Sequence, residues 1–268
     1  MPEQLGICDD YAMSSTADNT DLRNDVRRLA DLLGQTLARQ EGDELLSLVE
    51  SVRLAVRQGE QDQILNKLTD SQTISLVRAF GHFFNLANVA EQVNRSKDLA
   101  NEKNTTGSWL SRAVDNILAA QKMSKEFDQK DLQTWIDNFS VRPVFTAHPT
   151  EAARRSVLGK MTTISELLQQ PDSQTQSKRL AETIDLLWQT DELRLGRPEP
   201  LDEAVNSIYY LDELLQQTVP EVLAEFASEV KRLGVDLSLS AKPLSFGTWI
   251  GGDRDGNPNI TADVTRSA

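Results

Sequence analysis

The residues best suited to chemistry lie in one stretch near the middle of the chain, RPVFTAHPTEAARR (residues 142–155). A short apolar run, residues 144–147, leads into His148, and an amphipathic pattern follows. This order predicts a strand, a turn and a helix, with His148 at the carboxyl end of the strand. In β/α folds, side chains at that end face the substrate. The alternative is a histidine whose ring is satisfied by backbone hydrogen bonds.

Two arginines, Arg154 and Arg155, fall in the first turn of the predicted helix. Cations at this end oppose the helix dipole, whereas Glu151 suits it. A bound anion would remove the conflict, because helix N-termini bind phosphates and carboxylates. The pattern therefore predicts an anion site at this arginine pair, and the alternative is that both side chains are simply solvated.

A second stretch repeats the order of strand, polar turn and helix. Residues 245–250 form a candidate strand, GGDRDGNPN (residues 251–259) a turn, and Thr261 a helix cap. The glycines allow the backbone to approach a ligand closely. The turn begins like a calcium loop, but Pro258 and Val264 stand where such a loop needs glycine and glutamate, so we predict no metal site here. A tight, self-bonded turn is the alternative.

The elements that position these stretches are mostly helical. Apolar residues at helical spacing predict helices along most of the chain up to residue 139, with Thr69 and Gln72 at capping-box spacing and a polar loop at 101–107. His82 lies among helical aromatic residues, and we interpret it as structural. Further helices are predicted after His148 and at about 202–217 and 220–233, with Gly234 as a stop.

Composition narrows the class of protein. The 268 residues are 39% hydrophobic and carry a net charge of −13, which makes the chain a poor non-specific binder of nucleic acid. A single cysteine excludes an internal disulfide framework, and no apolar run is long enough to span a membrane. A cytoplasmic protein fits these features. The first 20 residues are polar and aperiodic, so we expect a mobile tail.

Several blocks resemble one known family. VFTAHPTEAARR resembles the histidine motif of phosphoenolpyruvate carboxylase, and FGTWIGGDRDGNPNITAD is similar to another block of that family. Residues 22–37, 78–92 and 187–204 also look like it, so the resemblance covers about residues 20–268. It implies a mainly α fold with a few β-strands: an N-terminal helical layer plus the first two strands of an incomplete β/α (TIM-like) barrel. We expect residues 21–268 to be the N-terminal part of a single larger catalytic domain, truncated at its C-terminal end.

The resemblance also implies a reaction. Family members carboxylate phosphoenolpyruvate with bicarbonate, using Mg²⁺ or Mn²⁺, and form oxaloacetate and phosphate through carboxyphosphate and an enolate. By resemblance, His148 takes the carboxyphosphate proton, Trp249 lies against the phosphoenolpyruvate methylene, and Arg254 helps hold its loop beside the site. In some relatives the pair matching Arg154 and Arg155 contributes to a sugar-phosphate activator site. A homotetramer is implied too.

The family's metal ligands and most of its substrate-binding arginines are expected beyond residue 268. We therefore expect these 268 residues alone to be inactive. Two other classes of function compete with the enzyme: a non-catalytic helical interaction module that keeps the motifs only as structure, and an anion-binding regulatory protein that uses Arg154 and Arg155.

Overall fold

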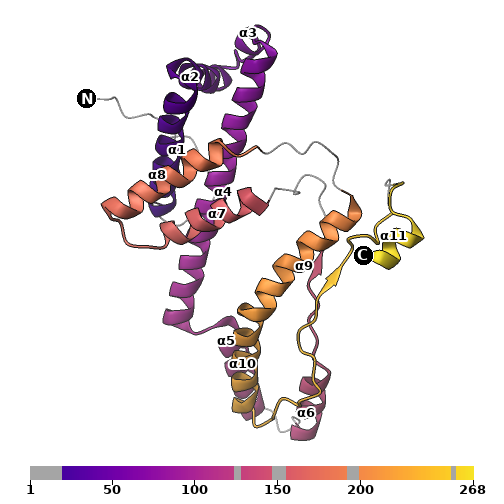
Figure 1. The fold of residues 1–268 in the computed structure, drawn as a ribbon. Coiled ribbons are helices and arrows are strands. Elements are labelled where there is room, and N and C mark those ends of the chain that lie inside the picture. Colours follow the sequence, from indigo (N-terminus) through magenta and orange to yellow (C-terminus); the bar gives the residue numbers. More distant parts are fainter. Residues whose placement is uncertain (1–19, 124–127, 147–154, 192–198, 255–257) are drawn as a thin grey trace. The chain divides into compact units, whose positions relative to one another are not determined.

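The computed structural model describes residues 20–123, 128–146, 155–191, 199–254 and 258–268, and it is mainly helical with two short parallel strands (Figure 1). The mainly α class is therefore confirmed. The elements are α1 (Thr20–Glu41), α2 (Asp43–Gln58), α3 (Asp62–Leu65), α4 (Asp70–Thr106), α5 (Trp109–Met123), α6 (Gln129–Asn138), β1 (Val144–Phe145), α7 (Arg155–Leu168), α8 (Gln174–Trp188), α9 (Pro200–Gln216), α10 (Thr218–Arg232), β2 (Gly247–Thr248) and α11 (Ala262–Ser267).

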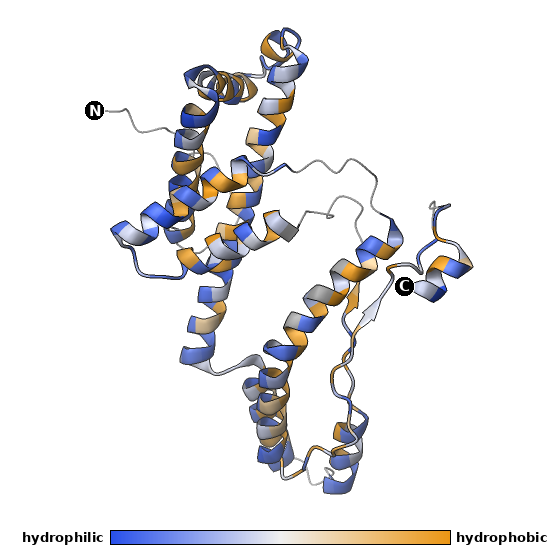
Figure 2. Cartoon of the chain, in the orientation of Figure 1, coloured by the Kyte–Doolittle hydropathy of each residue, from blue (hydrophilic) through white to orange (hydrophobic). Residues whose placement is uncertain are grey.

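These elements divide into two compact units. The first contains α1, α2, α3, α7, α8 and α4 as far as Leu99. The second contains the end of α4, then α5, α6, α9, α10, α11 and both strands. Hydrophobic and hydrophilic residues alternate along α1, α8 and α10, as expected for amphipathic helices that bury one side (Figure 2). Each unit has its own apolar core.

The core of the first unit is built from α1, α4, α7 and α8. The apolar side of α1 is buried from Leu22 to Leu37, as its helical spacing in the sequence predicts, and it packs against the apolar side of α8. Leu180, Ile184 and Leu187 of α8 are fully buried. Burying each such side chain contributes about 1.5–3 kcal/mol before entropy is counted, so this seam is a main source of stability.

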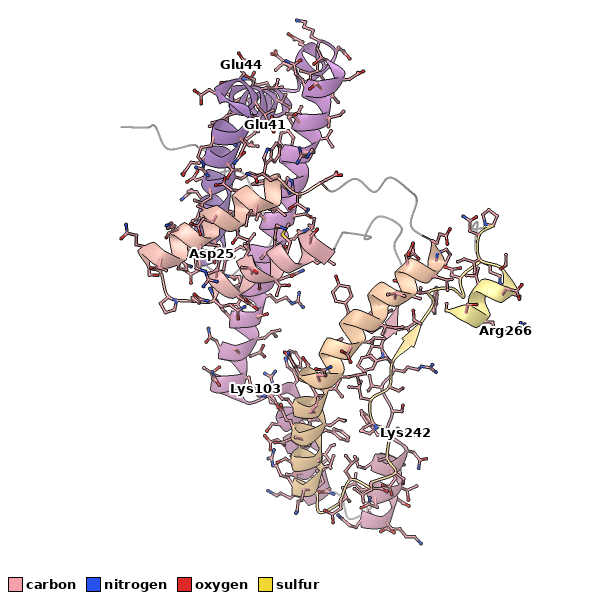
Figure 3. The ribbon with its side chains drawn as sticks, viewed as in Figure 1. Asp25, Glu41, Glu44, Lys103, Lys242 and Arg266 are labelled. Carbon is pink, nitrogen blue, oxygen red and sulfur yellow. The ribbon has the colours of Figure 1, made fainter. Side chains whose placement is uncertain are left out.

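A cluster around Trp188 closes one end of this core. The Trp188 indole Nε1 donates a 3.0 Å hydrogen bond to Glu41 Oε1, at the end of α1 (labelled in Figure 3). Arg78 lies over the indole ring, 4.4 Å from its centroid, and donates to the Trp188 carbonyl. The His82 ring meets the Trp188 ring edge-on, with the two ring centroids 5.5 Å apart, and His82 is fully buried. Burial, and then the Arg78 charge, lower the pKa of His82 to about 4, which fits the packing role predicted for it.

A second polar contact joins α1 to α8. Thr36 is fully buried and donates a 2.6 Å hydrogen bond to Asp185 Oδ1, which also accepts from Arg39 at 2.7 Å. The threonine is thus a polar group that the core tolerates only because its hydroxyl has an anionic acceptor.

The second unit packs α10 against α5, α6 and α9. Val114, Leu132, Phe226 and Val230 are buried at its centre, and Phe139 stacks on Phe226 with ring centroids 5.2 Å apart. Gly234 follows α10 with a φ of +76°, as predicted for the residue that ends this helix.

One prediction about helix ends is confirmed and another is wrong. Thr69 and Gln72 form the predicted capping box, because each backbone N–H donates to the other's side chain. The loop predicted at 101–107 is instead the last part of α4, which continues to Thr106. Lys103 (labelled in Figure 3) reaches Glu225 at 2.7 Å, and Gly107, at a φ of +79°, follows the helix. Residues 101–106 contain no proline or glycine, so tertiary contacts override their polar composition.

Candidate active site

Two parallel strands form the scaffold on which the predicted site residues are placed. Val144 of β1 pairs with Gly247 of β2, and Phe145 pairs with Thr248. Backbone hydrogen bonds extend the pairing at both ends, from Val141, which donates to the Pro243 carbonyl, to Trp249, which donates to the Phe145 carbonyl at 2.9 Å. Both strands are shorter than the strands predicted from the sequence at residues 144–147 and 245–250.

The parallel register brings the ends of the two motifs to one edge. The carboxyl ends of parallel strands lie at the same edge of a sheet, so Thr146 and Trp249 follow their strands side by side. The predicted His148 comes three residues after Phe145. Trp249 is held by its backbone, and 57% of it is exposed. Its indole is therefore available as an apolar surface at this edge.

The loop after Trp249 folds back on itself. The N–H groups of Gly252 and Asp253 both donate to the Trp249 carbonyl, at 2.9 and 3.0 Å. Gly251 has a φ of +71°, and a β-carbon added there would lie 2.4 Å from the Ala268 β-carbon. Only glycine fits this turn, as both its conformation and its space exclude a side chain. These bonds belong to a tight, self-bonded turn, which was the alternative to a ligand-binding loop for this stretch, and a role of the glycines toward a ligand stays a prediction.

Arg254 is held to the helix that follows the loop. Its Nη2 lies 3.4 Å from the hydroxyl of Thr265 on α11, a long hydrogen bond. The predicted cap of that helix is present, because the Thr261 hydroxyl accepts from the Val264 N–H. These contacts place Arg254 on the loop that begins at Trp249.

Sequence reasoning missed one close contact in this scaffold. A β-carbon added at Gly247 would lie 3.0 Å from Arg142 Nε and 3.5 Å from Cζ and Nη2, so the guanidinium lies against the glycine backbone. The signal was present in the sequence, since a glycine inside a strand often marks a close approach of another group. Arg142 thus packs against β2 at the residue that pairs with Val144.

Three of the predicted site residues lie wholly or partly outside the described residues. His148 and Arg154 lie outside the described residues. Arg155 is the first residue of α7, which confirms the helix predicted after the motif, but its side chain is not described. The proton-transfer role of His148 and the anion site at the arginine pair therefore remain predictions.

The described residues show neither a metal-binding cluster nor a membrane-spanning helix. Within the described ranges, no group of three or more histidine, cysteine, aspartate or glutamate side chains is arranged to hold a metal ion. None of the described helices has the length and apolar composition that crossing a bilayer requires.

Comparison with known proteins identifies the family. A sequence model of phosphoenolpyruvate carboxylase matches residues 22–268. The chain is 35% identical over 265 residues to the phosphoenolpyruvate carboxylase of Edwardsiella ictaluri, covering 92% of this chain and 30% of that protein. It is 36% identical over 273 residues to that of a Marinomonas species and 35% over 268 residues to that of Acinetobacter baylyi. Each of these two matches covers 91% of this chain, and they cover 30% and 29% of the two proteins.

The chain belongs to the phosphoenolpyruvate carboxylase family. It spans about 30% of the length of the curated relatives it matches. The resemblance inferred from the motifs is thereby confirmed.

Proposed function

We propose that this chain is the N-terminal part of a phosphoenolpyruvate carboxylase and carries a share of its active site. The observation that best supports this is the parallel register of β1 and β2, within a match to the family that runs from residue 22 to 268. The register sets the ends of two motifs at one edge, as a shared active site requires. The barrel to which these strands would belong is part of the proposal.

The reaction gives each candidate residue a task. Bicarbonate attacks the phosphoryl group of phosphoenolpyruvate, and carboxyphosphate and the enolate of pyruvate form. His148 then accepts the carboxyphosphate proton, for which an imidazole with a pKa near 6.5 is suited at neutral pH. Loss of CO₂ from carboxyphosphate leaves phosphate, and the enolate carbon attacks that CO₂ to give oxaloacetate.

Trp249 and Arg254 support this chemistry without reacting. The exposed indole of Trp249 would give the phosphoenolpyruvate methylene an apolar wall and shield the enolate from water. Arg254, on the same loop, would help keep that wall in place through its contact with α11. Arg154 and Arg155 would bind an anionic effector at the start of α7. A divalent metal would neutralise the anionic substrates, and its ligands are expected in the part of the family's polypeptide that this chain does not span.

The test is a two-product assay of a joined polypeptide. Residues 1–268 are fused to the part of the Edwardsiella ictaluri enzyme that they do not match, and phosphate and oxaloacetate are measured together. His148→Asn keeps a polar group but cannot accept a proton at neutral pH. We expect bicarbonate-dependent phosphate release to persist while oxaloacetate formation falls roughly 10²-fold or more.

The control is a thermal melt of the same variant. A parallel loss of both products together with a lower melting temperature would assign His148 to the scaffold and refute its catalytic role. Residues 1–268 alone should yield no oxaloacetate above the His148→Asn background.

A further inference from the structure

Arg142 lies just before β1, and its guanidinium rests against the backbone of Gly247 in β2. A β-carbon at Gly247 would be 3.0 Å from Arg142 Nε and 3.5 Å from Cζ and Nη2. No other described residue forms a hydrogen bond or an ion pair with this exposed side chain. The guanidinium is therefore held by packing, and its charge has no anionic partner within the described part of the chain.

The register of the two strands decides which face carries this cation (Figure 1). The pairing keeps one register from the isolated bridge before β1 to the end of β2. Side chains two residues apart along a strand point to the same face. Arg142 therefore shares a face with Gly247 and with Trp249, whose N–H continues the backbone ladder past β2. The rings of Phe145 and Phe246 meet on the opposite face, with their centroids 6.0 Å apart.

The guanidinium lies at a distance from Trp249 that one small substrate can bridge. Trp249 comes two residues after Gly247, and two residues of a strand span about 6.6 Å. Phosphoenolpyruvate carries its carboxylate and its phosphate on the carbon next to the methylene. A methylene placed against the indole therefore leaves both anionic groups near a cation on the same face. Arginine suits such groups, because its planar fork of donors binds carboxylate and phosphate through two hydrogen bonds at once.

Gly247 provides the room in which the guanidinium lies. It is not one of the glycines with a positive φ, so its backbone conformation is one that other residues also adopt. Glycine inside a strand weakens the strand, and such a residue often marks the close approach of another group. At this position the approaching group is Arg142, since even a single β-carbon would press on Nε at 3.0 Å.

We propose that Arg142 is a further substrate-binding residue of the carboxylation site, whose guanidinium binds an anionic group of phosphoenolpyruvate, and that Gly247 keeps the space for it. This inference rests on the proposed function, because it needs the methylene of the substrate to lie against Trp249. The first part of the family's polypeptide then contributes a cation of its own to a site that must hold several negative charges.

Steady-state kinetics of the joined polypeptide test this role. Arg142→Met keeps the alkyl stem but removes the charge and the donors. We expect the KM for phosphoenolpyruvate to rise roughly tenfold, while kcat, the KM for bicarbonate and the melting temperature stay unchanged. Arg142→Lys should recover part of the loss, because it restores the charge without the planar fork. Lys242→Met removes an exposed cation five residues before Gly247 (labelled in Figure 3) and should leave both KM values unchanged.

Substitution of Gly247 tests the geometry. Gly247→Val suits a strand but fills the place of the guanidinium, so the KM for phosphoenolpyruvate should rise roughly threefold or more. In an Arg142→Ala background the same substitution should cause no further rise, because there is no guanidinium to displace. The four proteins of this double-mutant cycle thus measure the contact between the two residues.

The outcomes separate this inference from the proposed function. An active joined polypeptide whose KM for phosphoenolpyruvate is equal in wild type and Arg142→Met would overturn the role of Arg142 alone. Parallel changes in kcat, KM and melting temperature would assign Arg142 to the strand scaffold and also overturn it. Additive effects of the substitutions at Arg142 and Gly247 would refute the inferred contact. A wild-type joined polypeptide that forms no oxaloacetate would instead refute the proposed function, and the role of Arg142 would fall with it.

Discussion

His82 should make the free energy of unfolding fall as the pH is lowered through the neutral range. The ring is fully buried against Trp188, and burial and the Arg78 charge lower its pKa from the ordinary 6.5 to about 4. In the unfolded chain the pKa of the His82 ring returns to the ordinary 6.5. Between these two pKa values the unfolded state binds a proton that the folded state does not, so acid favours unfolding.

The magnitude follows from the two pKa values. Above pH 6.5 both states are neutral at this ring and the pH has no effect through it. As the pH falls from 6.5 to about 4 the penalty grows, and below the folded pKa it levels at about 3 kcal/mol. Between pH 7.5 and 5.5, a range above the pI of 4.7, the expected loss is about 1.3 kcal/mol.

Urea unfolding of wild type and His82→Phe at several pH values measures this loss. Phenylalanine keeps an aromatic edge against Trp188 but does not titrate. Asp25 and Asp31, whose pKa burial raises, titrate in both proteins, so their effects cancel in the difference. His148→Asn is the matched control, because His82 and His148 are the only histidines in the chain and the second should leave the difference curve unchanged.

Parallel pH dependences in wild type and His82→Phe would refute the reasoning, since they would show that the ring titrates normally in the folded state. If His82→Phe does not fold, NMR titration of the two histidine rings in the wild-type chain gives the answer. One ring must then keep its neutral chemical shift down to about pH 5.

Three further predictions test stability and the site. Thr36→Val, which removes the 2.6 Å hydrogen bond to Asp185 but keeps the shape, should lower the free energy of unfolding by about 1.5 kcal/mol in urea; an unchanged value would contradict the importance of this contact. Gly81→Ala should raise the free energy of unfolding by about 0.5–1 kcal/mol, because an added β-carbon would lie in open space on α4. Gly251→Ala should lower it by about 1 kcal/mol, because its φ is +71°. Shifts of the melting temperature in the same direction for both variants would count against both arguments. Trp249→Ala in the joined polypeptide should raise the KM for phosphoenolpyruvate roughly tenfold without lowering the melting temperature, and an unaltered KM would rule out the apolar wall.

Most helices could be predicted because their periodicity reports directly on a buried side. The stripe from Leu22 to Leu37 and the capping box at Thr69 and Gln72 are local patterns, and both are present in the structure. The end of α4 could not be predicted, because residues 101–106 are polar and are supported by partners elsewhere in the sequence. The contact between Lys103 and Glu225 spans 122 residues, a distance at which local patterns carry no information.

The order of secondary-structure elements at the candidate site could be predicted from the sequence, but the contacts between residues far apart in the chain could not. A strand precedes a helix at both motifs, and Trp249 directly follows β2, inside the span of 245–250 that was predicted as strand. The packing of Arg142 against Gly247 required the register of two strands far apart in the chain.

The parallel pairing of β1 with β2 also sets the timing of folding during synthesis. About 100 residues separate the paired strands, so at about 5–20 residues per second β1 leaves the ribosome some 5–20 s before its partner exists. Closing a loop of that length costs about 4 kcal/mol in chain entropy, which two short strands cannot recover alone. The four helices α7 to α10 are made in the interval and form in far less than a second. The edge that carries Thr146 and Trp249 is therefore assembled after these four helices. Any pause in translation between the two strands extends the time for which β1 remains an unpaired edge open to other chains.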